Sequence, residues 1–296
     1  MTSPQQPMLG IIGGTGMAEA LGSLGSGVQH RVDTPFGPPS SPITVVEVAG
    51  APVALLPRHG DGHRFPPSQV PYRANVFALK AVGVTHLVAT SAAGSLREEI
   101  HPGELVVPDQ IIDRTFRRVP TFFDDLAVHV EFAQPFCHSL RKVLLGARSE
   151  VRVHGGGTYV CMEGPQFSTR AESDLHRAWG AQLIGMTLMP EAKLAREAEL
   201  CYAAVNLVTD YDCWRPHPAD LGDHELLEEI VGNLRATTGA ALALLRAALP
   251  AIQSLAASGC LCQVSLERAV FTSGTQIHEG TRKTLDLLLR RALRNR

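Results

Sequence analysis

Residues 185–214, GMTLMPEAKLAREAELCYAAVNLVTDYDCW, contain the signals of a strand end, a helix and a second strand in one short unit. The mostly apolar run Gln182–Met186 predicts a strand that stops at Thr187. Pro190 then suits the first turn of a helix, where the missing N–H of proline costs no hydrogen bond. The apolar run Tyr202–Val208 predicts a buried strand. Strand, helix and strand in this order are typical of an α/β sheet.

The second predicted strand leads into two acidic residues, Asp210 and Asp212. Because side chains alternate along a strand, both carboxylates point to one side if the strand extends that far. Ligands of open α/β sheets bind at the carboxyl ends of the strands, which is where these acids lie. We therefore interpret the pair as a site for a polar heterocycle.

Length and composition indicate one globular α/β domain. The 296 residues are enough to bury a full core, and 45% hydrophobic with 19% charged residues is ordinary globular composition. The formal net charge of −2 gives no polycation, so we expect no nucleic-acid partner. The start MTSPQQPM lacks the regions of a signal peptide, and Arg246 and Pro250 interrupt the apolar stretch 239–257. We expect a cytoplasmic protein with no membrane partner.

The six cysteines show no paired CxxC spacing, so the sequence predicts no zinc site and no bound metal. Six cysteines scattered in a chain of this length also do not form the disulfide framework of a small secreted domain. Cys260 and Cys262 are too close for a relaxed bridge to each other, and we interpret them as two unrelated thiols. Most of the cysteines are expected to be small buried hydrophobes.

The strand predicted over 9–12 runs into the glycine-rich segment GGTG at 13–16. This segment is either a tight turn or a nest whose backbone N–H groups hold an anion together with the Thr15 hydroxyl. A dinucleotide-binding GxGxxG motif is disfavoured, because Glu19 occupies the position of the third glycine.

Two more predicted strands end in groups suited to an anion. The strand over 53–57 ends in Arg58-His59-Gly60, and a guanidinium in that position can bind phosphate through two N–H groups, although an isolated arginine is usually a surface charge. The strand over 85–89 ends in TSAAGS at 90–95, which we interpret as a turn. Its hydroxyls, including that of Ser91, suit an anion cradle, and the alternative is simple helix–sheet packing.

The sequence alone leaves two interpretations for each of three residues. His63 is either a lid residue that reaches the ligand or a solvated loop histidine. His129 lies in a predicted loop, where a lone histidine is more often structural than catalytic. Phe167 follows a predicted strand over 158–162 and could stack on an aromatic ligand, although such a phenylalanine is by default core.

The remaining hydrophobic patterns predict the elements around this site. Strands are expected over 43–48, 103–107 and 110–112, and helices over 75–82, 172–179, 224–249, 266–271 and 282–293.

The predicted strand ends thus carry two kinds of chemistry. Hydroxyls, an arginine and a glycine nest suit an anion, whereas two acids and an aromatic ring suit a basic heterocycle. Phosphate with a purine is the natural pair. No activated serine or cysteine constellation and no lysine-centred Walker loop supports covalent catalysis or nucleotide hydrolysis.

Eight motifs in order resemble the trimeric purine nucleoside phosphorylase superfamily, and within it the methylthioadenosine phosphorylase family. They are GIIGGTG at 10–16, DTPFG at 33–37, RHG at 58–60, ATSAAGSLREEIHPGE from 89, DRT at 113–115, EGPQFSTRAE from 163, MTLMPEAKLAREAE from 186 and TDYDCW from 209. Cys260-Leu261-Cys262 also resembles the Cys-x-Cys of prokaryotic members. The match covers residues 9 to about 252.

The resemblance implies an α/β fold with a single domain, in which helices flank a central mixed twisted β-sheet. The domain would span 9–296, ending in C-terminal helices, after a flexible tail over 1–8. The implied reaction is phosphorolysis, in which phosphate attacks C1′ of methylthioadenosine and releases adenine and 5-methylthioribose 1-phosphate. No cofactor is implied, inorganic phosphate is a co-substrate, and the assembly is a homotrimer.

The residue roles that the resemblance implies fall into two groups. Phosphate would be bound by Thr15, Arg58, His59, Ser91, Ala92 and Thr187. The nucleoside would be bound by Met186 under the ribose, Phe167 on the base, His63, and His129 lent by a neighbouring subunit, with Asp210 protonating purine N7 and Asp212 accepting from the 6-amino group.

Asp210 and Asp212 also set the expected specificity, because relatives that select 6-oxopurines carry an asparagine in this motif. A 6-oxopurine or methylthioinosine phosphorylase is the alternative, and a catalytically silent purine-binding protein is a further one. Three residues depart from the family pattern: Gln166 replaces an arginine, Ser91 replaces a threonine, and Leu188 stands where small or polar residues are common.

Overall fold

The computed structural model describes residues 8–14, 17, 20, 25–215 and 223–294. Its first strand, β1, begins at Met8, one residue before the predicted domain start. The rest of the predicted tail and Thr15 lie outside the described residues.

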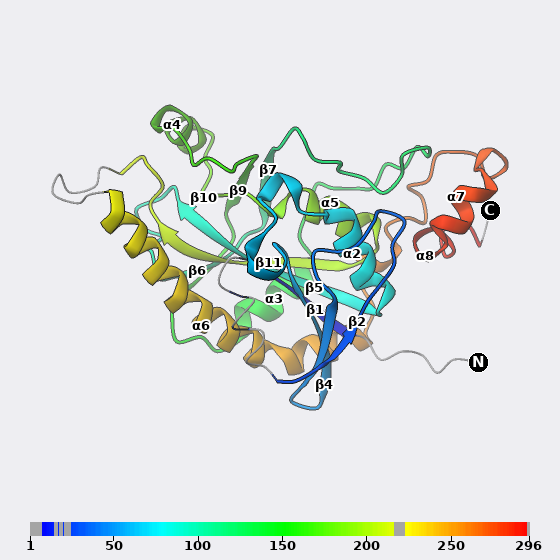
Figure 1. Cartoon of the computed structure of the whole chain (residues 1–296), viewed down its shortest axis with the longest axis horizontal. Coiled ribbons are helices and arrows are strands. Elements are labelled where there is room, and N and C mark those ends of the chain that lie inside the picture. The colour runs from blue at the N-terminus through cyan, green and yellow to red at the C-terminus, as the bar shows by residue number, and fades with distance from the viewer. Residues whose placement is uncertain (1–7, 15–16, 18–19, 21–24, 216–222, 295–296) are drawn as a thin grey trace.

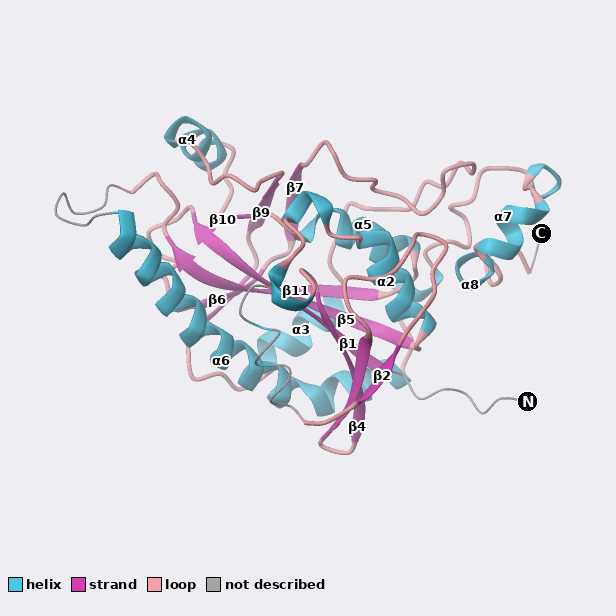
Figure 2. Cartoon of the chain, viewed as in Figure 1, coloured by secondary structure: helices cyan, strands magenta, loops and turns pink. Residues whose placement is uncertain are grey.

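A mixed sheet of the described strands forms the centre of the molecule (Figures 1 and 2). Its strands are β1 (Met8–Gly13), β2 (Val28–His30), β3 (Ile43–Val48), β4 (Ala51–Pro57), β5 (Val84–Ser95), β6 (Leu105–Val107), β7 (Gln110–Arg114), β8 (Val153–Gly155), β9 (Thr158–Met162), β10 (Leu183–Gly185) and β11 (Cys201–Asp210). The order is β2-β3-β4-β1-β5-β10-β9-β7, and β11 joins β5 to β6, which pairs with β8. Parallel pairs at β1–β4, β1–β5 and β5–β11 stand beside antiparallel pairs at β3–β4, β5–β10 and β6–β11, which confirms the predicted mixed sheet.

Helices cover both faces of this sheet (Figure 2). They are α2 (Tyr72–Ala81), α3 (His138–Gly146), α4 (Arg170–Ala178), α5 (Leu188–Glu197), α6 (Asp223–Ala257), α7 (Glu279–Thr284) and α8 (Asp286–Leu289). One core layer joins the sheet to α2, α5 and α8 through residues such as Phe77, Leu194 and Tyr202. The other joins it to α3 and α6 through residues such as Leu140 and Leu245. A sheet that is buried on both faces needs helices on both faces. This arrangement is the single α/β domain that the sequence predicted.

Helix α6 extends further than predicted, to Ala257, and contains Pro250. By length and composition alone, its segment Ile230–Ala257 would suffice to cross a membrane, with a mean hydropathy of 1.5 and 39% of its most apolar window buried in the chain. Its buried residues Ala241, Leu245 and Ile252 belong to the core layer that contains the β11 residues Ala203 and Val205. A core helix satisfies the same length and composition test, so these contacts favour a place in the core.

The structure corrects three predicted elements. Residues 90–95 are not a turn, because β5 continues through them and pairs with β11 and β10. Residues 266–271 are not a helix: the segment after η3 (Leu261–Val264) forms turns, and its backbone pairs with 127–129. The helix predicted over 282–293 is divided into the short helices α7 and α8, with Leu285 between them.

Candidate active site

A pocket of about 530 Å³ opens where β4, β5, β10 and β11 end. Its lining includes ten of the residues that the sequence predicted: Arg58, His59, His63, Ser91, Ala92, Phe167, Met186, Thr187, Asp210 and Asp212. Gly14 from the glycine-rich segment also lines it, and its N–H donates to Thr90 Oγ1 at 3.2 Å. The pocket thus lies at the carboxyl ends of the parallel strands β4 and β11 and beside the last residues of β5, where open α/β sheets bind ligands, and the antiparallel strand β10 contributes its end.

Arg58 lies fully buried at one end of the pocket and is already held by an acid. Its Nε donates to Glu191 Oε1 at 2.5 Å, Nη2 donates to Glu191 Oε2 at 3.1 Å, and Nη1 donates to the Thr90 carbonyl at 2.8 Å. Burial alone would lower the pKa of Arg58, but the charge and hydrogen bonds of Glu191 raise it above its usual value. Three of the five guanidinium N–H groups are used, which leaves two for an anion in the pocket.

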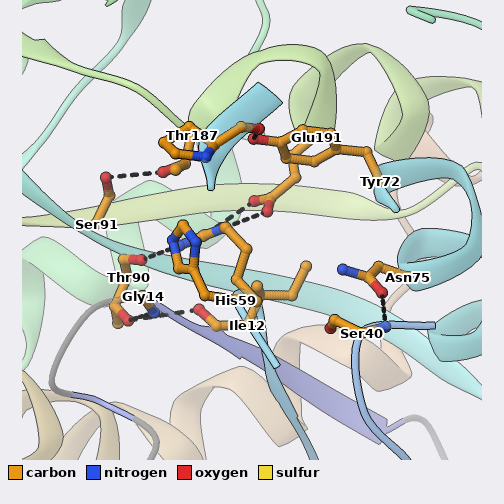
Figure 3. Close-up of polar contacts among 12 residues, drawn as sticks. Ile12, Gly14, Ser40, His59, Tyr72, Asn75, Thr90, Ser91, Thr187 and Glu191 are labelled. Atoms are coloured by element: carbon orange, nitrogen blue, oxygen red, sulfur yellow. Dashed lines mark hydrogen bonds and ion pairs between the residues drawn. The ribbon is translucent and has the colours of Figure 1, made fainter. Parts of the chain in front are cut away.

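Two hydroxyls lie at the same end of the pocket (Figure 3). Ser91 Oγ and Thr187 Oγ1 are 3.0 Å apart, and both belong to the pocket lining. Tyr159 Oη lies 3.5 Å from Ser91 Oγ and 3.5 Å from the Thr187 backbone nitrogen. A Cβ on Gly185 would lie 2.1 Å from this tyrosine oxygen, so only glycine allows the tyrosine to support both residues.

His59 contributes a neutral ring to the pocket. Its Nδ1–H donates to the Phe65 carbonyl at 2.8 Å, which leaves Nε2 as an acceptor. Burial and the positive charge of Arg58 lower the pKa of His59 to about 4. His63 stacks on His59 with ring centroids 4.1 Å apart, and it lines the pocket. His63 is nevertheless an exposed residue, so the lid residue and the solvated loop histidine both stay open.

Asp210 and Asp212 form the opposite chemical end of the pocket. Asp210 Oδ2 accepts from the Thr209 hydroxyl at 2.7 Å, and Oδ1 accepts from the Asp212 N–H at 2.7 Å. The sequence predicted that strand alternation would bring the two carboxylates together. This prediction is wrong, because β11 ends at Asp210 and Asp212 has a positive φ of 52°. A bulge between Val208 and Asp210 and the hydrogen bond to the Asp212 N–H place them instead.

Asp212 offers the unsatisfied acceptor of this pair. Its Oδ2 is buried and has no hydrogen-bond partner among the described residues. Burial, and further the negative charge of Asp210, raise the pKa of Asp212. A Cβ on Gly94 would lie 3.0 Å from Asp210 Oδ1, so the absence of a side chain there gives the acids room. Buried acceptors without a partner are rare, and here the pocket can supply a donor.

Phe167 and Met186 line the apolar part of the pocket. The Phe167 side chain is 72% exposed, which excludes the interpretation of this residue as core. Met186 is partly buried, and its Sδ lies where a side chain on Gly164 would clash. An exposed ring beside a half-buried thioether suits the faces of a flat ligand.

Three supporting residues escaped the sequence analysis: Glu191, Tyr159 and Arg118. Arg118 donates to the carbonyls of Met186 at 2.6 Å and Met189 at 2.5 Å, and its Nε donates to Glu163 Oε1 at 3.1 Å. It thereby fixes the backbone on which the pocket residues stand. A signal existed for Glu191, because it is an acid in a helix whose other early positions are apolar.

His129 lies outside the pocket of its own chain. Its ring contacts Phe271 with centroids 5.1 Å apart, and its backbone N–H donates to the Ala269 carbonyl at 2.8 Å. A role in the site of a neighbouring subunit stays a prediction.

Comparisons with known proteins agree with this geometry. Residues 8–250 match the model of the Phosphorylase superfamily. The S-methyl-5'-thioadenosine phosphorylase of Gloeobacter violaceus is 44% identical over 96% of this chain and 95% of its own length, and that of Cereibacter sphaeroides is 46% identical over 97% and 99%. A solved methylthioadenosine phosphorylase from an antarctic soil metagenomic library is 41% identical, with a TM-score of 0.87 over 97% of this chain and 100% of that one. The Schistosoma mansoni methylthioadenosine phosphorylase in complex with tubercidin is 36% identical, with a TM-score of 0.77 over 88% and 98%.

Fold and pocket together define an enzyme of the nucleoside-phosphorylase class, a pentosyltransferase with an anion end and an acidic end. The chain belongs to the Phosphorylase superfamily, and within it to the family of the S-methyl-5'-thioadenosine phosphorylases.

Proposed function

We propose that this chain catalyses the reversible phosphorolysis of S-methyl-5'-thioadenosine to adenine and 5-methylthioribose 1-phosphate. The observation that carries the proposal is the pocket itself, which has Arg58 and two hydroxyls at one end and a partly buried acid pair at the other. A reaction between phosphate and a purine nucleoside needs both ends in one cavity.

Phosphate would bind beside Arg58, Ser91 and Thr187, with Thr15 and Ala92 completing the site. The two free N–H groups of Arg58 and the two hydroxyls would supply donors, and the neutral Nε2 of His59 would accept a hydrogen bond from a phosphate hydroxyl. Because Glu191 neutralises the guanidinium, the arginine orients the phosphate without binding it too tightly to react. Ser91 keeps the hydroxyl that the family's usual threonine would provide.

The nucleoside would lie with its ribose over Met186 and its base beside Phe167, and His63 would close over the sugar. Asp212 Oδ2 would accept a hydrogen bond from the 6-amino group of adenine, and this bond would supply the partner that the buried oxygen lacks. This contact favours a 6-aminopurine over a 6-oxopurine, whose oxygen would face the carboxylate without a proton between them.

Catalysis would consist of positioning and of charge stabilisation. As the bond from C1′ to the purine breaks, negative charge develops on the base and positive charge on the sugar. Asp210 would protonate N7 of the leaving purine and so neutralise the negative charge that develops on the base. The phosphate oxygens would stabilise the sugar and then attack C1′ from the opposite face.

The proposal includes a cytoplasmic homotrimer that needs no cofactor for its reaction. His129 would complete the 5′-methylthio pocket of a neighbouring subunit, since it lies away from the pocket of its own chain. Leu188 is fully buried and fits the packing at the start of α5, whereas Gln166 is exposed between Pro165 and Phe167, which both line the pocket.

The test is base release from methylthioadenosine, adenosine, methylthioinosine and inosine, each with and without phosphate, followed by chromatography. We expect adenine release that depends on phosphate and is fastest with methylthioadenosine. Preferential release of hypoxanthine would transfer the chain to the 6-oxopurine branch, and binding without release of any base would contradict catalysis.

A further inference from the structure

Four of the six cysteines, from three segments that are far apart in the sequence, converge at one point. The Sγ atoms of Cys137, Cys201, Cys260 and Cys262 all lie within 4.8 Å of one another. Cys260 and Cys262 are therefore not the unrelated thiols that the sequence predicted. The cluster is separate from the pocket, whose lining contains none of these cysteines.

Three elements bring the cluster together. Cys137 is the N-cap residue of α3, Cys201 is the first residue of β11, and Cys260 and Cys262 lie just after the end of α6. Cys137, Cys201 and Cys262 are buried in the core layer between the sheet and α6, and Cys260 is partly buried at its edge.

The separations suit four ligands of one ion. A tetrahedral zinc–thiolate centre has Zn–S distances of about 2.3 Å, which places its sulfur atoms roughly 3.8 Å apart. Cys137 Sγ and Cys260 Sγ lie 3.7 Å apart, and no pair in the cluster exceeds 4.8 Å. A disulfide holds its two sulfur atoms at about 2.05 Å, and all four cysteines are free thiols.

The N-terminus of α3 favours a thiolate at Cys137. Cys137 Sγ accepts from the backbone N–H of Leu140 at 3.5 Å, at the positive end of the α3 dipole. His86 is paired with Cys201 in the β5–β11 ladder, and its Nε2 is buried without a hydrogen-bond partner among the described residues. Metal-bound sulfur atoms commonly receive such outer hydrogen bonds.

We propose that Cys137, Cys201, Cys260 and Cys262 bind one Zn²⁺ per chain as a closed structural site. Four thiolates and burial leave no open position for water, so the ion does not take part in phosphorolysis. Its effect is to tie the segment after α6 to α3 and to the beginning of β11. The site replaces the sequence-based expectation that the chain binds no metal.

The experiment begins with the full-length protein, expressed in zinc-supplemented medium and purified under reducing conditions without chelators. We expect elemental analysis to give one zinc per chain, and X-ray absorption to show four sulfur neighbours at about 2.3 Å. Iron in place of zinc, or nitrogen and oxygen neighbours, would overturn the assignment.

Variants then locate the ion. Cys260→Ser is the first choice, because Cys260 is only partly buried and its loss disturbs the core least. We expect it to weaken zinc binding by about 100-fold or more in competition with a coloured chelator. Cys161→Ser is the matched control, since Cys161 is a buried cysteine outside the cluster, and it should keep one zinc per chain. Equal zinc content in both variants would overturn the proposal.

A last measurement separates the metal from disulfides. Cells are lysed into denaturant with an alkylating reagent, and the mass of the chain reports how many thiols were free. We expect all four cluster cysteines to be alkylated, and the reduced, metal-free protein to take up zinc again. Disulfide-linked cluster cysteines, or failure of the reduced and folded protein to bind zinc, would refute the site.

Discussion

The substitution Asp212→Asn tests how the pocket recognises its base. The change keeps the shape of the side chain, and asparagine tolerates the positive φ of 52° at this position. It replaces a carboxylate oxygen by an amide that presents either a donor or a weaker acceptor. The exposed acid Asp174 on α4 provides a matched control, Asp174→Asn, because it lies outside the pocket lining.

The expected magnitude follows from the burial of Asp212 Oδ2. A hydrogen bond to a charged group contributes about 1.5–3 kcal/mol, and a buried donor left facing another donor adds roughly 1 kcal/mol. The loss in kcat/KM for methylthioadenosine is then about 2.5–4 kcal/mol, or roughly 70- to 900-fold. Methylthioinosine should gain, because its 6-oxygen can accept from the new amide.

The assay measures kcat/KM for both nucleosides at saturating phosphate in the wild type, Asp212→Asn and Asp174→Asn. We expect the preference for methylthioadenosine to fall by at least about 70-fold in Asp212→Asn alone. A preference unchanged within about threefold would refute the contact between Asp212 and the 6-amino group, and it would revive the 6-oxopurine alternative.

Three further predictions concern the supporting groups. Asp210→Ala should lower kcat by about 10²- to 10⁴-fold while the assembly seen by gel filtration is unchanged, because a general acid contributes that much; near-normal turnover would exclude its role. Glu191→Ala should lower the free energy of unfolding in urea by about 3–5 kcal/mol, since it leaves Arg58 buried without its counter-charge, and an unchanged midpoint would contradict this. Because the pKa of His59 is lowered, the unfolded state binds a proton between about pH 6.5 and pH 4 that the folded state does not bind. The free energy of unfolding is therefore unaffected by this residue above about pH 6.5 and falls by up to about 1.4 kcal/mol per pH unit toward pH 4. Urea unfolding should give a lower free energy of unfolding at pH 5 than at pH 7 in the control His138→Gln, whose substituted residue is exposed, and a smaller decrease in His59→Gln.

The sequence predicted the members of the pocket well because their positions follow from local patterns. A buried apolar run identifies a strand, the residue after it lies at the carboxyl end, and the ends of parallel strands meet at one edge. Arg58, Thr187 and Asp210 were found in this way, whereas Ser91 lies inside β5, which continues to Ser95. The structure places all four around one cavity.

The contacts that fix those residues were not predictable from local patterns. The ion pair between Arg58 and Glu191 joins positions 133 residues apart, and nothing near either residue specifies the partner. The segment 266–271 has a helical apolar spacing, but its backbone pairs with 127–129, a tertiary contact that overrides the local preference. The cysteine cluster likewise draws Cys137 and Cys201 to Cys260 from distant parts of the chain.

The register between β5 and β11 sets the distance between the two ends of the pocket. Ser91 pairs with Asn206 and Gly94 pairs with Asp210, so the anion end and the acid end are three residues apart along β5, which is about 10 Å. A slip by one residue would turn every side chain to the other face, and a slip by two would move the acids by about 6.6 Å. The hydrogen-bond pairing of β5 with β11 thus determines how far apart phosphate and the leaving purine would be held. Because the register fixes the distance between the two ends of the pocket, a different spacing would require a change in the pairing of β5 with β11.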